Sequence, residues 1–124
     1  MRLLLGKVLY ALHRYQDSLT VVFPVYQSAG EREAAKLIAA KLIAANYAAL
    51  EDWTSALSYL EKLMTQATEI SVLNLAAECY LNLNRPEKAL PLLRKSLELN
   101  PAQTHIKDLE DKTKKQLKIK NNYN

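Results

Sequence analysis

Glycine, proline and cysteine are scarce in this sequence, which holds two glycines, four prolines and one cysteine among its 124 residues. With so few residues suited to tight turns, helices joined by short connections are favoured over a fold rich in hairpins. The lone Cys79 cannot form an intramolecular disulfide and has no neighbour at metal-ligand spacing. A reducing compartment is therefore the default, and we expect a cytoplasmic protein.

Long apolar runs are also missing. The run at the start of the chain, residues 3–5, is interrupted by Lys7. It is shorter than the roughly 7 to 15 residues of a signal-peptide core. No stretch reaches the about 18 consecutive apolar residues that a membrane-spanning helix needs. The sequence therefore predicts neither a leader peptide nor a membrane span.

The positive charge is concentrated at the C-terminal end of the chain. The formal net charge is +4, and residues 105–124 hold six lysines against three carboxylates, a local balance of +3. Because the remainder is close to neutral, we expect no nucleic-acid surface on the body of the protein. Polyanion binding through the lysine-rich C-terminal segment stays open as a less favoured function.

The sequence contains an internal repeat. Residues 46–64 (NYAALEDWTSALSYLEKLM) align with residues 79–97 (CYLNLNRPEKALPLLRKSL) at a constant offset of 33. Residues 8–26 form an earlier copy at an offset of 38. Within each copy, apolar residues recur every three or four positions, which is the period of a helix with one buried face. Each copy is therefore predicted to form a pair of helices.

Short polar segments separate the two helices of each copy, at HRYQD, LEDWT and LNRPE. Each segment is followed by a small residue, Ser18, Ala56 or Ala89, at a point where helices packed about 8 to 10 Å apart leave little room. Pro24 in the first copy is expected to kink its helix or to end it early. Residues 30–50 then read as one long helix.

These residues resemble the tetratricopeptide repeat, over about residues 2–101. The third copy fits best, with Leu73, Ala76, Ala77, Tyr80, Pro86, Ala89, Leu93, Ser96 and Pro101. The second copy supplies Ala40, Ile43, Ala44, Tyr47, Trp53, Ala56, Leu60 and Leu63. The first supplies Leu5, Gly6, Leu9, Tyr15, Ser18, Val22 and Val25. The resemblance implies an all-α fold, a right-handed superhelix of three helix-turn-helix repeats.

The expected organisation is a single domain over residues 1–120, with repeats over about residues 1–30, 31–68 and 69–102. After Pro101, apolar residues continue at helical spacing through Ile106, Leu109 and Leu117. We predict a capping helix over about residues 104–120, with a polar outer face that covers the last repeat. Residues 121–124 are expected to be a disordered tail.

In this family the first helix of each pair lines a concave groove that binds a partner helix or an extended peptide. By register, we call the following residues the groove positions: Lys7, Tyr10 and Ala11; Ile38, Lys41, Leu42, Ala45, Ala48 and Ala49; Asn74, Leu75, Glu78, Leu81 and Asn82. An apolar, alanine-lined strip of this kind marks an interaction site when it is exposed. The same spacing also allows Ala45, Ala48 and Ala49 to pack against a neighbouring helix.

The resemblance implies a non-catalytic protein–protein interaction module or scaffold, or alternatively a regulatory segment of a larger protein or complex subunit. One branch of the family binds the C-terminal carboxylate of chaperone tails through Lys, Asn and Arg side chains. The corresponding positions here hold Leu3, Lys7, Leu42, Ser71 and Leu75. A chaperone tail is therefore not the expected partner.

No catalytic, cofactor or metal-ligand constellation stands out in the sequence. His13, Cys79 and His105 have no mutual spacing that suits a metal or a nucleophile with its base. At the start of the chain, the apolar side chains of Leu3 and Leu4 have no preceding repeat to cover them. This face is expected to meet another repeat in a longer array, or a second copy of the chain in a homo-oligomer.

Overall fold

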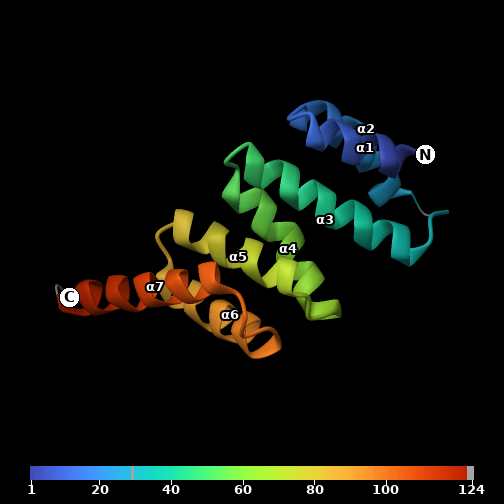
Figure 1. Ribbon diagram of the computed structural model, residues 1–124. Coiled ribbons are helices and arrows are strands. Elements are labelled where there is room, and N and C mark those ends of the chain that lie inside the picture. The colour runs from blue at the N-terminus through green and yellow to red at the C-terminus, as the bar shows by residue number, and fades with distance from the viewer. Residues whose placement is uncertain (29, 123–124) are drawn as a thin grey trace. The chain divides into compact units, whose positions relative to one another are not determined.

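A computed structural model describes residues 1–28 and 30–122 (Figure 1). Over these residues the chain is helical and contains no strand. The helices are α1 (Arg2–Ala11), α2 (Tyr15–Gln27), α3 (Glu33–Ala49), α4 (Trp53–Gln66), α5 (Ile70–Asn82), α6 (Pro86–Leu99) and α7 (Thr104–Asn122). Within this described part, no helix is both long and apolar enough to cross a membrane.

The helices belong to two compact units, Met1–Gln66 with α1 to α4 and Ala67–Asn124 with α5 to α7. In the first unit, helices that are consecutive in the chain pack against each other, and α1 also contacts α3. In the second unit, α6 packs against both α5 and α7. Packing between consecutive helices confirms the predicted all-α fold of helix pairs. The right-handed superhelix and the single domain over residues 1–120 stay predictions.

The helix boundaries refine the expected organisation. Helices α1 and α2 lie within residues 1–30, α3 and α4 within 31–68, and α5 and α6 within 69–102. The C-terminal helix begins at the expected Thr104 but continues to Asn122. The expected disordered tail is therefore wrong for Asn121 and Asn122, while residues 123–124 lie outside the described residues.

Helix α2 continues past Pro24 and ends at Gln27, so the expected early end is wrong. A proline inside a helix removes one hydrogen bond and its ring clashes with the preceding turn, at a combined cost of roughly 3 kcal/mol. Burial of Val22 and Val25 on either side of the proline, at 0% and 5% exposure, offsets that cost by holding the last turn against the core. Tertiary packing has overridden the local preference.

Each helix pair turns at a residue with left-handed backbone conformation. The φ angle is 60° at His13, 61° at Glu51 and 59° at Asn84. These positions are 38 and 33 residues apart, the same offsets that relate the three copies in the sequence. The repeat is therefore present in the backbone geometry as well as in the side-chain pattern.

The turn between α3 and α4 illustrates the hydrogen bonding at these positions. The Glu51 N–H donates to the carbonyl of Ala48 at 3.0 Å, and the Asp52 N–H donates to the carbonyl of Tyr47 at 2.8 Å. The other two turns have bonds of the same spacing. This pair of bonds is the Schellman motif, in which glycine is the usual left-handed residue. Here a glutamate occupies that position.

Replacement of Glu51 by glycine should therefore stabilise the protein by about 1 kcal/mol. The left-handed conformation costs an ordinary residue about 1–2 kcal/mol, and the greater chain entropy of unfolded glycine takes back part of the gain. Urea unfolding followed by circular dichroism measures the change. Asn84→Gly is the control, because asparagine tolerates this conformation and the gain should be smaller. Loss of stability in Glu51→Gly would count against the assigned turn.

A buried hydrophobic cluster of the first unit lies between α2 and α3. It consists of Leu19, Val22, Val25, Ala39, Leu42 and Ile43. Leu3 from α1 packs partly buried against this cluster. Helix α1 approaches α2 and α3 closely at Gly6. A Cβ added there would overlap a methyl group of Val22 and lie 3.1 Å from Leu42. The absence of a side chain at Gly6 is thus a condition for this packing.

Candidate functional site

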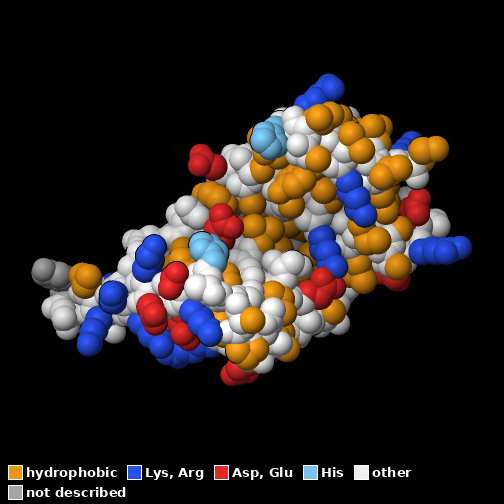
Figure 2. Space-filling model, in the orientation of Figure 1, with side chains coloured by type: hydrophobic (Ala, Val, Ile, Leu, Met, Phe, Trp, Pro, Cys, Tyr) orange, Lys and Arg blue, Asp and Glu red, His pale blue; other side chains and the backbone are white. Residues whose placement is uncertain are grey.

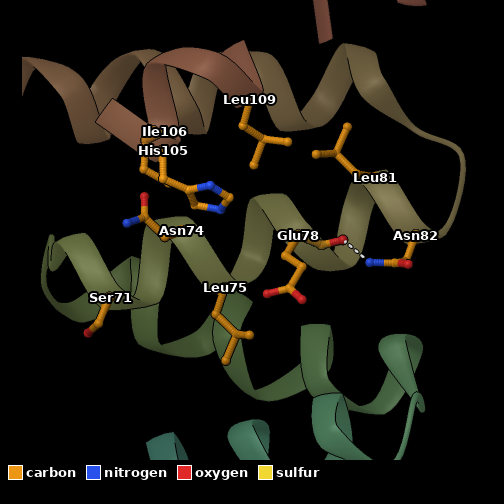
Figure 3. A pocket seen from close by; sticks show the side chains of 9 residues that line it. All are labelled: Ser71, Asn74, Leu75, Glu78, Leu81, Asn82, His105, Ile106 and Leu109. Carbon is orange, nitrogen blue, oxygen red and sulfur yellow. Dashed lines mark hydrogen bonds between the residues drawn. The ribbon is translucent and has the colours of Figure 1, made fainter. Parts of the chain in front are cut away.

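In the second unit, α5 and α7 form the walls of a pocket of about 570 Å³, which we call the α5–α7 pocket (Figure 3). It is lined by Ser71, Asn74, Leu75, Glu78, Leu81 and Asn82 from α5 and by His105, Ile106 and Leu109 from α7. The α5 residues follow the three- and four-residue spacing of one helix face. Figure 3 shows the side chains of His105 and Leu109 pointing from α7 toward α5. Helices α5 and α7 both pack against α6, and they provide the opposite walls of the pocket.

A hydrogen-bonded network fixes the start of α7 against α5. The Ser96 hydroxyl donates to Asn74 Oδ1 at 2.6 Å, and Asn74 Nδ2 donates to Gln103 Oε1 at 2.9 Å. Gln103 Nε2 donates in turn to the carbonyls of Ser96 and Asn100, at 3.1 and 3.0 Å. Ser96 is fully buried. Asn74 therefore positions the pocket, with both ends of its amide already engaged in holding the α6–α7 loop.

Glu78 gives the pocket its charge. Among the described residues that line it, Glu78 has the sole carboxylate and none is a lysine or an arginine. The Glu78 side chain is exposed, whereas its backbone carbonyl accepts a hydrogen bond from Asn82 Nδ2 at 2.9 Å (Figure 3). Apolar side chains complete the lining: Leu75, Leu81, Ile106 and Leu109. The pocket thus combines an apolar wall with one solvated negative charge.

The five groove positions predicted on α5 all line this pocket: Asn74, Leu75, Glu78, Leu81 and Asn82. The sequence did not indicate that α7 supplies the opposite wall. The sequence predicts Ile106 and Leu109 only as apolar positions of the capping helix and predicts no role for His105. The helical spacing of Ile106 and Leu109 could have indicated this wall. A capping helix with an apolar face lies beside the last repeat, so part of that face borders the exposed face of α5.

In the first unit, the groove positions on α1 and α3 differ in exposure. Lys7, Tyr10, Ala11, Ile38 and Ala49 are exposed, Lys41 and Ala45 are half-buried, and Leu42 and Ala48 are buried. Figure 2 shows hydrophobic side chains gathered over α1 and α3, with Lys or Arg side chains among them. Leu42 belongs to the core beside Gly6, so it offers almost no surface to a partner. The alignment of the repeats predicted the helix face on which Leu42 lies, but it did not predict that α1 covers this residue.

The two leucines proposed for self-association lie in different surroundings. Leu3 is half-buried against the core, whereas Leu4 is 64% exposed. Other apolar side chains of the first helix and the turn after it are exposed as well, namely Leu5, Val8 and Leu12. Self-association through this face stays a prediction.

Cys79 lies on α5 beside Glu78 but is fully buried. Burial, together with the negative charge of Glu78, raises the pKa of the Cys79 thiol to about 12. The thiol therefore stays protonated at neutral pH and is neither a nucleophile nor a thiolate metal ligand. Within the part of the chain that the structure describes, no cluster of His, Cys, Asp and Glu side chains could hold a metal ion.

A family model described as tetratricopeptide repeat matches residues 47–112. This segment is slightly more than half of the chain and includes every residue that lines the α5–α7 pocket. No curated protein matches the chain.

Proposed function

Since the chain belongs to the tetratricopeptide repeat family, we propose that it is a non-catalytic protein–protein interaction module. Its ligand is a helix or an extended peptide of another protein. The α5–α7 pocket carries this proposal, because it lies on the helix face that such repeats present to their ligands. Its volume of about 570 Å³ is within the roughly 300–1,000 Å³ of ligand-binding clefts.

The chemistry of the lining supports recognition of a side chain rather than a reaction. Leu75, Leu81 and Leu109 provide apolar surface, and the polar groups around them are solvated or bonded to the protein's own backbone and side chains. An amphipathic helix that binds in a groove places its apolar residues against surface of this kind. In the first unit, the exposed groove positions on α1 and α3 are the corresponding contact surface. As a scaffold, the chain would act in the cytoplasm.

A second candidate function is polyanion binding through α7. Lys114, Lys115 and Lys118 lie together around Asp111 at a shallow surface recess. Phosphate binding by such lysines would weaken steeply as salt concentration rises. Lys114 also pairs with Glu110, at 3.6 Å, which reduces the local excess of positive charge. The protein-binding function is favoured for this reason.

Affinity capture with the immobilised chain tests the proposal. Leu81→Arg places a charge in the α5–α7 pocket, and Leu99→Arg is the matched control on a 51% exposed leucine outside it. We expect a partner protein, identified by mass spectrometry, to be retained by Leu99→Arg and lost by Leu81→Arg. Circular dichroism should be unchanged in both variants.

Two further variants separate the alternatives. Ala45→Arg alters the half-buried surface of α3 in the first unit. The double variant Lys112→Glu/Lys115→Glu reverses charge on exposed positions of α7. Capture that survives both arginine substitutions in the groove positions and vanishes with the lysine variant would replace the proposal by polyanion binding.

A further inference from the structure

We propose, resting on the function above, that the α5–α7 pocket selects partners that insert a basic side chain, lysine or arginine, beside an apolar residue. The inference concerns the chemistry of the ligand. It assigns the selecting charge to Glu78 and the apolar contacts to Leu75, Leu81 and Leu109, all of which line the pocket.

The charge of Glu78 is available to a partner. Two other glutamates of the second unit pair with cations of the chain, Glu87 with Lys120 at 3.5 Å and Glu110 with Lys114 at 3.6 Å. Within the described part of the chain, no ion pair engages the Glu78 carboxylate. It is also the sole charged residue of α5 at neutral pH. A cation brought by a ligand would therefore meet no competitor from the lining.

The apolar wall suits the stem of a long basic side chain. Lysine and arginine bury their methylene groups along apolar surface and keep the charged group at the polar edge. Leu75 and Leu81 are half-buried on α5, and Leu109 points from α7 toward α5 near Leu81 (Figure 3). An acidic side chain in the same place would be repelled by the carboxylate of Glu78. Among the described lining residues, His105 is the only other titratable group. The pocket thus disfavours acidic ligands.

Titration of the ¹⁵N-labelled 124-residue chain with short peptides tests the selection. The probes are acetyl-Leu-X-Leu-amides in which X is lysine, glutamine or glutamate, and binding is followed by amide chemical shifts. We expect shifts in residues 71–82 and 105–109. The lysine peptide should bind about two- to fivefold more tightly than the glutamine peptide, within the range of an exposed ion pair, and the glutamate peptide should bind most weakly.

Substitutions at Glu78 assign the selection to its carboxylate. Glu78→Gln should abolish the preference for lysine while the shifts stay in the pocket, and Glu78→Lys should make the glutamate peptide the tightest. Glu98→Gln is the matched control, because Glu98 is an exposed glutamate on α6 that does not line the pocket. The preference for lysine should persist in this variant.

The outcomes separate the inference from the proposed function. Equal affinity of the three peptides, with shifts in the pocket, would overturn the charge selection and leave the pocket as a binding site. A preference that persists in Glu78→Gln would overturn the role of Glu78. Absence of shifts at the lining residues with every peptide would overturn the proposed function together with the inference.

Discussion

Gly6→Ala should destabilise the first unit by about 2 kcal/mol, although alanine is the better helix former. An alanine Cβ at this position would overlap a methyl group of Val22 and lie 3.1 Å from Leu42. Val22 is fully buried and β-branched, so its methyl group cannot move aside without a change of rotamer or a backbone shift. Overpacking of this kind costs typically 1–3 kcal/mol, which outweighs the roughly 1 kcal/mol that alanine gains over glycine inside a helix.

Urea unfolding followed by the fluorescence of Trp53 measures this loss, because Trp53 is the single tryptophan of the chain and lies in the same unit. Gly30→Ala is the natural control. Its nearest atom, the Ser28 hydroxyl oxygen, would be 3.9 Å from the new Cβ, and its φ angle is not positive. That variant should be neutral or slightly more stable. An unchanged unfolding midpoint in Gly6→Ala would contradict the close approach of α1.

The repeat was the strongest signal in the sequence, and the structure explains why. Residue spacing alone placed the polar segments that contain His13, Glu51 and Asn84 between helices, and the backbone turns at these residues. A Schellman motif depends on local hydrogen bonds within about six residues. Features of this range leave a pattern that one sequence can reveal.

Features set by the packing of distant residues were harder to predict. Leu42 shares its helix face with exposed groove positions, yet it is buried because α1 has a glycine opposite. The start of α7 is held near α5 by Asn74 and Gln103, which are 29 residues apart. Neither polar residue carries a periodic signal. The predicted groove was therefore incomplete on the side that α7 provides.

Asn46 is the clearest example of a polar residue whose role depends on the packing of distant segments, because its amide connects three helices. Its Nδ2 donates to the Ser18 hydroxyl and to the Leu42 carbonyl, at 2.9 Å each. The Ser18 hydroxyl donates to the carbonyl of Gly6 at 2.7 Å. Asn46 is fully buried, and its Oδ1 has no hydrogen-bond partner within the described part of the chain. The surroundings of Asn46 therefore accept hydrogen bonds from a neutral donor, and within the described part of the chain no donor pairs with its Oδ1.

Asn46→Asp should consequently destabilise the first unit by about 3 kcal/mol or more at neutral pH. The substitution removes both N–H donors and places a carboxylate beside the Leu42 carbonyl, where a buried charge is uncompensated. Burial raises the pKa of the new carboxyl above its unfolded value of about 3.9. The charge penalty is therefore absent below the unfolded pKa and grows as pH rises toward the folded pKa.

The difference in stability between variant and wild type, measured by urea unfolding at a series of pH values, tests this sign. It should shrink as pH falls from 8 toward about 4, because the carboxyl then becomes protonated in the folded state. Asn84→Asp makes the same change of charge on an exposed turn residue and should show a small difference that varies little with pH. A difference for Asn46→Asp that is constant across this range would mean that water reaches the carboxylate, so the contact of α1 with α2 and α3 would be open in solution.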